Sequence, residues 1–325
     1  MKKPHIVIIT PALAKANNGN SLTASRWARF LRTRYAVTLT LQWDGTPCDA
    51  MIALHARRTA SSIAAFAAAH PKAPLIVVLT GTDLYRDIHS DAAAQRSLQL
   101  ATHLVVLQAA GLQELDVNFR NKTTVIYQSA PVLKPISPQK KNKMRHFEVT
   151  MIGHLRDEKD PVTFMRAAAQ LSSAKIRMTH IGDALDPLLG AQAAATQRAC
   201  SNYRWLGKLS HSDTRQRLKR SHLMVITSVM EGGAHVIIEA VNSGVPVLAS
   251  NISGNLGMLG ENYAGYFPLG DSAELARLID LAASDAAFYT VLQTQCAERA
   301  PLFMPEQESA ALINLVDNCT GSHLA

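Results

Sequence analysis

Short apolar runs of strand type alternate with helical stretches along almost the whole chain, and this alternation constrains the fold more than any other feature. In the first half the strand-type runs cover 5–9, 35–41, 50–54, 75–79, 103–107 and 124–127. Helical stretches such as 22–33 and 61–70 lie between them. Strands separated by helices favour parallel sheets, because parallel neighbours need a long crossover connection. We therefore predict an α/β fold.

A segment at 130–146 interrupts this alternation with three prolines, five basic residues and no acidic residue, which is typical of an exposed linker. The alternation then restarts, with strands predicted at 147–152, 177–181, 203–206, 223–227 and 245–249 and a helical pattern from about Ser272. A chain of 325 residues is long enough for two domains of about 150 residues each.

We therefore predict two Rossmann-like domains whose strand-end loops face each other across a cleft. The expected parts are an N-terminal Rossmann-like domain, a linker, a C-terminal Rossmann-like domain and a final helix that packs back on the N-terminal domain, over 1–129, 130–146, 147–305 and 306–325.

Positive charge is concentrated in the first half of the chain. Residues 1–129 carry 14 Lys/Arg and 7 Asp/Glu, whereas residues 147–325 carry 14 and 18. A basic surface concentrates anions near it, but no RNP, zinc-finger or Gly/Arg-rich motif accompanies the charge. We therefore expect a small anionic substrate rather than nucleic acid. Four arginines, interpreted as one solvated helix face, supply part of the charge: Arg26, Arg29, Arg32 and Arg34.

Two other classes of protein are disfavoured. No stretch approaches the roughly 18 uninterrupted apolar residues of a membrane span, and the opening segment lacks the apolar length and cleavage site of a signal peptide. The four cysteines are widely spaced with no C-x-x-C, which indicates reduced thiols rather than a disulfide frame or a zinc site. We expect a cytoplasmic protein without a membrane span.

The most specific motif is the run SVMEGGAHVIIEAVNSGVPV at 228–247, which follows a predicted strand. Glu231 precedes a glycine turn, and Glu239 lies inside the helix that we expect to begin near Gly233. Glycines let the backbone approach a ligand closely, and the free N–H groups of a helix start favour a phosphate. Glu239 can reach hydroxyl groups, and Glu231 lies at the loop where a sugar ring would sit. An ordinary strand–turn–helix with solvated glutamates is the alternative interpretation.

Two Rossmann-like units with Glu-x7-Glu at this place resemble the retaining GT-B glycosyltransferases of family 4, and the resemblance covers nearly the whole chain. It implies that Glu231 contacts the donor sugar and that Glu239 contacts the ribose hydroxyls of a nucleotide diphosphate. It also implies phosphate and donor contacts from the turn: Gly232, Gly233 and Ala234.

A second motif of this family, Gly-Arg-Leu-x3-Lys-Gly, follows the first strand of the second domain. Here the run is GHLRDEKD, in which Gly153 and Lys159 match, His154 replaces the arginine and Asp160 replaces the glycine. The resemblance implies that Gly153 and His154 contact the donor and that Lys159 holds the leaving diphosphate. Arg156 is a candidate for the second positive charge. A charged loop that pairs within itself is the alternative.

The family also implies donor contacts from Gly19 and Asn20, in a turn at 18–20, and from Lys208, in the run WLGK. No Asp-x-Asp pair occurs in the chain, so the sequence lacks the metal clamp that is usual in the other major transferase fold. We expect Lys and Arg side chains and a helix terminus to stabilise the leaving group instead. We therefore expect neither a required metal nor a cofactor, with a UDP-sugar as co-substrate.

Polar side chains follow two buried strands of the first domain. His55, Arg57 and Arg58 follow 50–54, and Thr80 and Thr82 follow 75–79. Arginines and threonine hydroxyls suit a compact oxyanion, so we predict an anionic acceptor here, with His55 orienting it or donating a proton. The alternatives are arginines that cap the next helix in solvent and a structural histidine.

Five runs are similar to the selenosugar synthases of selenoneine biosynthesis: LHARRTA, LTGTDLYRDI, IGHLRDEKDP, SVMEGGAHVIIEAVNSGVPVLAS and NISGNLGMLGENYAGYFPLGD. This resemblance implies transfer of a sugar, N-acetylglucosamine in the typical case, from a UDP-sugar to selenophosphate. The products would be a 1-seleno-sugar, UDP and phosphate, and a downstream enzyme of the pathway would take the seleno-sugar. The alternatives are a family-4 glycosyltransferase with a phosphosugar, amino-sugar or lipid acceptor, a basic nucleic-acid-binding protein, and a sugar epimerase of the same architecture.

Overall fold

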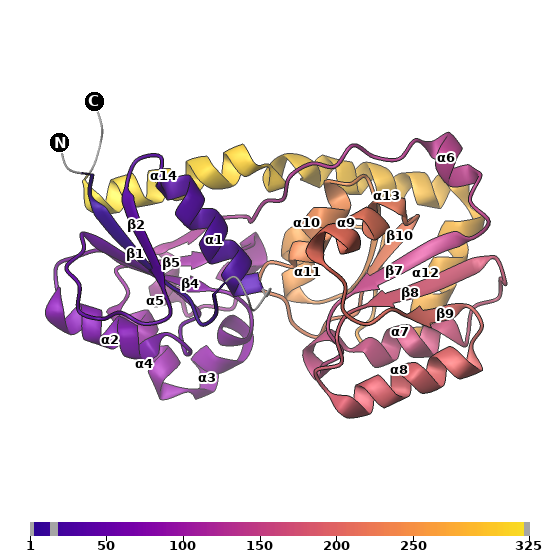
Figure 1. Cartoon of the computed structure of the whole chain (residues 1–325), viewed down its shortest axis with the longest axis horizontal. Coiled ribbons are helices and arrows are strands. Elements are labelled where there is room, and N and C mark those ends of the chain that lie inside the picture. The colour runs from indigo at the N-terminus through magenta and orange to yellow at the C-terminus, as the bar shows by residue number, and fades with distance from the viewer. Residues whose placement is uncertain (1–2, 14–18, 322–325) are drawn as a thin grey trace. The chain divides into compact units, whose positions relative to one another are not determined.

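The computed structural model describes residues 3–13 and 19–321 (Figure 1). Their contacts divide the chain into two compact units. The first comprises Met1–Ser129, Glu231–Gly233 and Met304–Ala325, and the second comprises Ala130–Met230 and Ala234–Phe303. Each unit contains a six-stranded parallel sheet with helices between its strands. The predicted α/β fold class is confirmed.

The first sheet has the strand order β2-β1-β3-β4-β5-β6, and all its neighbouring strands are parallel. Its strands are β1 (His5–Ile9), β2 (Ala36–Thr40), β3 (Ala50–Leu54), β4 (Leu75–Leu79), β5 (His103–Val106) and β6 (Thr123–Val125). The helices of this unit are α1 (Gly19–Leu31), α2 (Ala60–Ala69), α3 (Ile88–Ser90), α4 (Ala92–Leu100), α5 (Val117–Arg120) and α14 (Pro305–Thr320). A π-helical segment (Asp83–Asp87) and a 3-10 turn (Ala109–Leu112) complete it.

Helix α1 begins earlier than the sequence predicts. The expected start was Leu22, after a turn at 18–20, but Gly19 and Asn20 already lie in the first helical turn. The Thr23 hydroxyl donates to the Gly19 carbonyl, which ties that residue into the helix (2.8 Å). Asn18 lies outside the described residues.

Side chains of successive strand residues point to opposite faces of the first sheet and form two apolar layers. Ile6 and Ile8 pack on one face with Trp27 of α1 and Val316 of α14, whereas the alternate strand residues pack on the other face with Phe66 of α2. Both faces are buried, which explains why the strands read as continuous apolar runs in the sequence.

The C-terminal helix α14 is joined to α1 by a buried carboxylate. Glu308 is 1% exposed. It accepts hydrogen bonds from Arg26 Nε (2.7 Å) and Trp27 Nε1 (2.7 Å) on α1 and from the Ser129 amide (2.8 Å). Arg34 likewise pairs with Asp317 (2.5 Å). The interpretation of the four arginines at 26–34 as one solvated helix face was therefore wrong for Arg26, because its guanidinium neutralises a buried charge that is distant in sequence.

Replacing Glu308 should be among the most destabilising single substitutions in this unit. Glu308→Ala leaves the Arg26 charge and the Trp27 N–H without their acceptor, and the loss of one member of a buried pair costs about 3–5 kcal/mol. Glu306→Ala, on the exposed side of the same helix, should change the free energy of unfolding by less than about 0.5 kcal/mol. Urea unfolding of the two variants measures the difference, and equal stabilities would contradict this assignment.

The second sheet has the strand order β12-β11-β10-β7-β8-β9 and is also parallel throughout. Its strands are β7 (Phe147–Ile152), β8 (Ile176–Ile181), β9 (Tyr203–Trp205), β10 (Leu223–Ile226), β11 (Val247–Ser250) and β12 (Tyr266–Phe267). The helices are α6 (Pro138–Asn142), α7 (Pro161–Ala168), α8 (Pro187–Ala199), α9 (His211–Arg220), α10 (His235–Val241), α11 (Ser253–Leu259), α12 (Ser272–Ser284) and α13 (Ala286–Arg299). Two 3-10 turns are at Asp157–Lys159 and Ala300–Phe303.

The predicted exposed linker at 130–146 is partly buried. Ala130 is 1% exposed, and Lys141 of α6 is 7% exposed. The Lys141 ammonium donates to the Ser221 carbonyl (2.6 Å), and burial lowers its pKa to about 8. Lys141 is therefore not one of the exposed charges that the basic composition of the segment predicts. Its side chain instead fixes the segment to the second unit.

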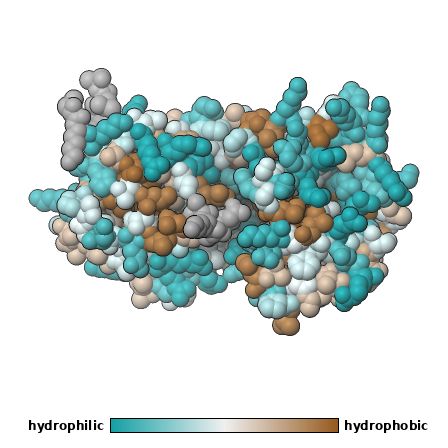
Figure 2. All heavy atoms as spheres, in the orientation of Figure 1, coloured by the Kyte–Doolittle hydropathy of each residue, from teal (hydrophilic) through white to brown (hydrophobic). Residues whose placement is uncertain are grey.

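Hydrophilic side chains cover much of the face drawn in Figure 2. Within the described ranges, no helix is long and apolar enough to cross a bilayer. All four cysteines are unpaired thiols.

Candidate functional site

The strand order of the second sheet places the predicted donor motifs at one point. From β7 the chain continues to β8 and β9 on one side, and from β10 it continues to β11 and β12 on the other. Ligands of open parallel sheets bind outside the carboxyl ends of the strands at such a switch point. The run 153–160 follows β7 and the run 227–234 follows β10, so both motifs begin at neighbouring strand ends.

The backbone around Lys159 is fixed by the loop that follows β10. The Thr227 hydroxyl donates to the Lys159 carbonyl (2.8 Å), and the Val229 amide donates to the Glu158 carbonyl (3.0 Å). The aliphatic stem of Lys159 passes over Gly153, where an added Cβ would lie 3.6 Å from Cγ of the lysine. The ammonium of Lys159 is therefore carried by a backbone that both neighbouring strand ends hold in place.

Asp160 explains one departure from the family motif. Its φ of 40° lies in the left-handed region that favours glycine, and Asp is among the few other residues that adopt this region readily. Its carboxylate also accepts from the Thr163 amide and caps α7 (3.3 Å). Asp160 thus supplies both the turn and the cap.

His154 replaces the family arginine without replacing its charge. Its Nδ1 accepts a hydrogen bond from the Asp183 amide (3.0 Å), so the neutral ring carries its proton on Nε2. Burial lowers the pKa of His154, and the positive charges of Arg156, Lys208 and Lys159 lower it further. These three cations therefore share the neighbourhood of His154, which favours an anion there.

Arg156 and Lys208 are more exposed to solvent than Lys159. Arg156 is exposed, and its Nε lies 3.8 Å from Oε2 of Glu158, so part of its charge is compensated within the loop. Lys208 is exposed in the loop after β9. Lys159 is partly buried, which makes its charge the least screened by water of the three.

His180 and Gly182 position Gly153 and were not predicted as site residues. His180 is fully buried on β8 and its Nε2 donates to the Gly153 carbonyl (3.2 Å), while Nδ1 accepts from the Tyr203 hydroxyl (3.1 Å). Burial lowers the pKa of His180 to about 4. An added Cβ on Gly182 would lie 1.8 Å from the Gly153 oxygen, so no larger residue fits. A histidine inside an apolar strand was the available sequence signal.

Glu239 is buried on α10 among three basic side chains. It is 3% exposed. Its Oε1 lies 2.6 Å from Nε2 of His211, 3.7 Å from Nε of Arg215 and 3.7 Å from Nε2 of His235. Burial alone would raise the pKa of Glu239, but the hydrogen bond from His211 and the charges of His235 and Arg215 outweigh it, so the pKa is lowered. The pKa of His211 is raised by the same hydrogen bond.

Sequence reasoning singled out Glu239 but not its three basic neighbours. His235 precedes it by one helical turn, a spacing that brings side chains together. His211 and Arg215 lie on α9, and no local pattern relates them to α10.

The turn between β10 and α10 differs in one detail from the prediction. Helix α10 begins at His235 rather than near Gly233, with Ala234 at the capping position. Glu231 is 8% exposed and Ala234 is 2% exposed. Contacts group Glu231–Gly233 with the first unit.

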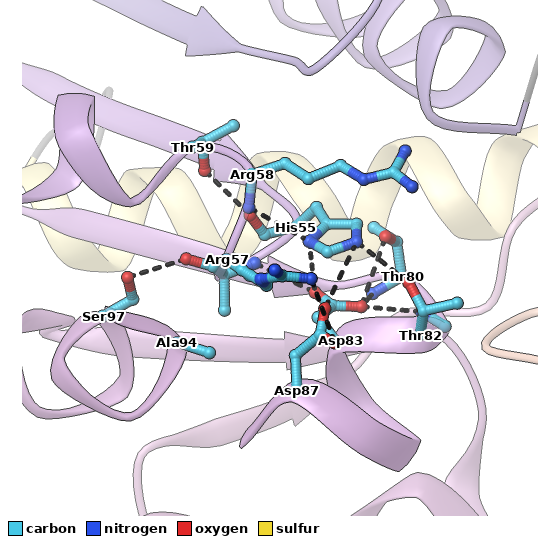
Figure 3. A network of polar contacts seen from close by, with 12 residues as sticks. His55, Arg57, Arg58, Thr59, Thr80, Thr82, Asp83, Asp87, Ala94 and Ser97 are labelled. Carbon is cyan, nitrogen blue, oxygen red and sulfur yellow. Dashed lines mark hydrogen bonds and ion pairs between the residues drawn. The ribbon is translucent and has the colours of Figure 1, made fainter. Parts of the chain in front are cut away.

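In the first unit, His55 and Thr82 meet at the ends of β3 and β4 (Figure 3). His55 is 2% exposed, and its φ of 77° is one of two left-handed values among the described non-glycine residues. Nδ1 accepts from the Arg58 amide (3.3 Å), so Nε2 donates to Oγ1 of Thr82 (3.0 Å). Burial lowers the pKa of His55 although Asp83 opposes that effect. Because the neutral ring donates to Oγ1 of Thr82, the Thr82 hydroxyl hydrogen points away from the ring.

Asp83 joins the two strand-end loops and was not predicted. It is completely buried and accepts hydrogen bonds from the amides of Ala56, Thr80 and Gly81, each at 2.9 Å. The strained backbone of His55 costs about 1–3 kcal/mol, and this network holds it in place. Backbone strain held by the surrounding structure is common at functional sites.

The two predicted acceptor arginines have different surroundings. Nε of Arg57 lies 2.9 Å from Asp91 and Nη1 lies 3.8 Å from Asp87, so two carboxylates compensate its charge. The guanidinium of Arg58 points away from Asp87 (Figure 3) and forms no ion pair with any residue in the described part of the chain. Of the two predicted arginines, Arg58 is therefore the better candidate to bind an anionic ligand.

Among the described residues, no group of three or more His, Cys, Asp and Glu side chains is arranged to hold a metal ion.

Two Rossmann-like α/β units with parallel sheets define a GT-B architecture, and solved structures share it. The chain is 19% identical to the Anabaena HepE protein in complex with UDP and glucose, with a TM-score of 0.78 over 97% of this chain and 100% of that one. It is 14% identical to a sucrose-phosphate synthase from Thermosynechococcus elongatus (TM-score 0.77, 99% and 100% covered). It is 15% identical to a glycosyltransferase from Rickettsia africae (TM-score 0.73, 98% and 99% covered).

The family is identified by the second half of the chain. Residues 134–302 match the model of the glycosyl transferases group 1 family. The chain belongs to this family.

Proposed function

We propose that this glycosyltransferase moves a sugar, N-acetylglucosamine in the first instance, from a UDP-sugar to selenophosphate. The bond between the anomeric carbon and the UDP oxygen breaks, and a carbon–selenium bond forms with retention of configuration. UDP leaves with the electron pair of the broken bond. Water then cleaves the selenium–phosphorus bond, which releases phosphate and leaves a 1-seleno-sugar. A downstream enzyme of selenoneine synthesis would consume that product.

The observation that carries the donor half is the placement of Lys159 and its loop at the switch point of the second sheet. A partly buried ammonium on a fixed backbone suits a diphosphate that gains charge as it leaves. Gly153 allows close approach, and Arg156 and Lys208 add positive charge nearby. Related folds support a UDP-sugar in particular, because HepE structures contain UDP and UDP-glucose and a pneumococcal O-GlcNAc transferase contains UDP and GlcNAc.

The remaining donor roles follow the family resemblance. Glu239 would accept hydrogen bonds from the ribose hydroxyls, and Glu231 would contact the donor sugar. The turn before α10 and the first turn of α1 would approach the phosphates: Gly232, Gly233 and Ala234, with Gly19 and Asn20.

The acceptor half is supported by the site of the first unit. Arg58 has no ion-pair partner among the described residues, and the Thr82 hydroxyl hydrogen points away from His55. Guanidinium and hydroxyl groups both bind oxyanions. Thr80 donates its amide to Asp83, which fixes this loop. Selenophosphate carries its nucleophile already ionised, so no side-chain base is needed, and a neutral His55 fits a positioning role.

The test is a mass-spectrometric assay with UDP-N-acetylglucosamine and selenophosphate, repeated with thiophosphate and with phosphate. The proposal expects a sugar that carries selenium, together with UDP and phosphate. If the protein binds UDP but forms no selenium-bearing sugar, the acceptor assignment is wrong and a conventional acceptor remains. The second candidate is a group 1 glycosyltransferase with a phosphosugar acceptor. The Arg58 guanidinium and the Thr82 hydroxyl support it equally, because they could bind the phosphate of such an acceptor.

Removal of divalent cations should leave the rate unchanged. We expect the cationic side chains around the donor site to stabilise the leaving UDP. The turnover number in the presence of excess EDTA should therefore equal the turnover number without EDTA. A loss that Mg²⁺ or Mn²⁺ restores would contradict this part of the proposal.

A further inference from the structure

The carboxylate of Glu239 has an asymmetric environment that its family role does not require. His211, Arg215 and His235 all approach the same oxygen, Oε1. The contacts that the described residues make with Glu239 leave Oε2 without a hydrogen-bond donor. One carboxylate oxygen is therefore held by the protein, whereas the other keeps its capacity to accept hydrogen bonds.

Of the three basic side chains, His211 makes the only hydrogen bond to Oε1 within the described part of the chain, at 2.6 Å. The nitrogens of Arg215 and His235 lie farther away, at 3.7 Å each. Arg215 is also tied elsewhere, because its terminal nitrogen donates to the Pro131 carbonyl (2.5 Å). The orientation of the Glu239 carboxylate consequently depends mainly on His211, at the first residue of α9.

From this geometry we infer that His211 is a positioning residue for the donor: it fixes Oε1 of Glu239 so that Oε2 faces the two vicinal hydroxyls of a nucleotide ribose. The inference rests on the proposed function, because it assumes a nucleotide donor. It adds a residue that neither the sequence motifs nor the family resemblance identify. It also predicts that His211 contributes to the affinity for the ribose hydroxyls and not to the affinity for the diphosphate.

The inference is tested by calorimetric binding of UDP and of 2′,3′-dideoxyuridine diphosphate, which has no ribose hydroxyls. His211→Ala should weaken UDP binding about tenfold, the effect of one charge-assisted hydrogen bond, and should leave dideoxy-UDP binding unchanged. His211→Gln, whose amide can donate to Oε1, should recover part of the UDP affinity. Arg220→Ala, an exposed charge at the other end of α9, is the control and should alter neither ligand.

The outcomes separate the inference from the function beneath it. If His211→Ala weakens both ligands equally, or neither, the inference is overturned while UDP binding by the wild-type chain still supports the proposed function. If the wild-type chain binds no UDP, the proposed function fails and the inference fails with it. Thermal unfolding of His211→Ala should match the wild type, since His211 is half-exposed, and a large loss of stability would instead indicate a purely structural role.

Discussion

Lys159→Ala should lower kcat for sugar transfer by about 10²–10³-fold, the typical cost of removing one preorganised group that stabilises developing charge. The reason is that Lys159 is partly buried and its backbone is fixed by Thr227. The fixed backbone would therefore place its charge beside the leaving diphosphate. The acceptor KM should stay unchanged. Steady-state kinetics with saturating donor measures both parameters.

Lys208→Ala is the matched control for this prediction. The Lys208 charge also reaches His154, but the residue is exposed, and water screens an exposed charge strongly. We expect kcat to fall by less than about tenfold. Equal losses of kcat in the two variants would mean that the summed positive charge matters and not the position of Lys159. A Lys159→Ala enzyme that keeps most of its kcat would contradict the role of Lys159.

Arg58→Ala should raise the acceptor KM by about 10- to 100-fold, because a hydrogen bond to a charged group contributes about 1.5–3 kcal/mol. UDP affinity should not change, since Arg58 is not among the residues that we propose to contact the donor. The measurement is acceptor titration at saturating donor, together with UDP binding by calorimetry.

Arg57→Ala provides the comparison, because it removes the same charge one residue away. Its guanidinium is compensated by Asp91 and Asp87, so the acceptor KM should change by less than about threefold. An Arg57→Ala variant with the larger effect would show that the ion pairs break in the complex and that the acceptor site is assigned to the wrong arginine.

The elements of this fold were predictable because their signals are local. Buried parallel strands such as β3 and β4 are apolar on both faces, so a run of apolar residues fixes their bounds within a residue or so of the structure. The start of α1 was missed, because Gly19 and Asn20 are typical turn residues that here begin a helix.

The site was predictable only in part because its contacts are not local. The motif residues Lys159 and Glu239 stand at recognisable spacings. By contrast, the hydrogen bond between His211 and Glu239 joins two helices, and that between Arg26 and Glu308 joins opposite ends of the chain. Which of the two arginines after β3 pairs with Asp91 follows from the packing of α4 and not from the sequence near Arg57.

The most direct measurement is a crystal structure of the protein with UDP. The account predicts that the diphosphate lies beside Lys159 and Gly153 at the carboxyl end of β7 and that the ribose hydroxyls donate to Oε2 of Glu239. A nucleotide bound anywhere else on the chain, or a ribose that does not contact Glu239, would contradict it.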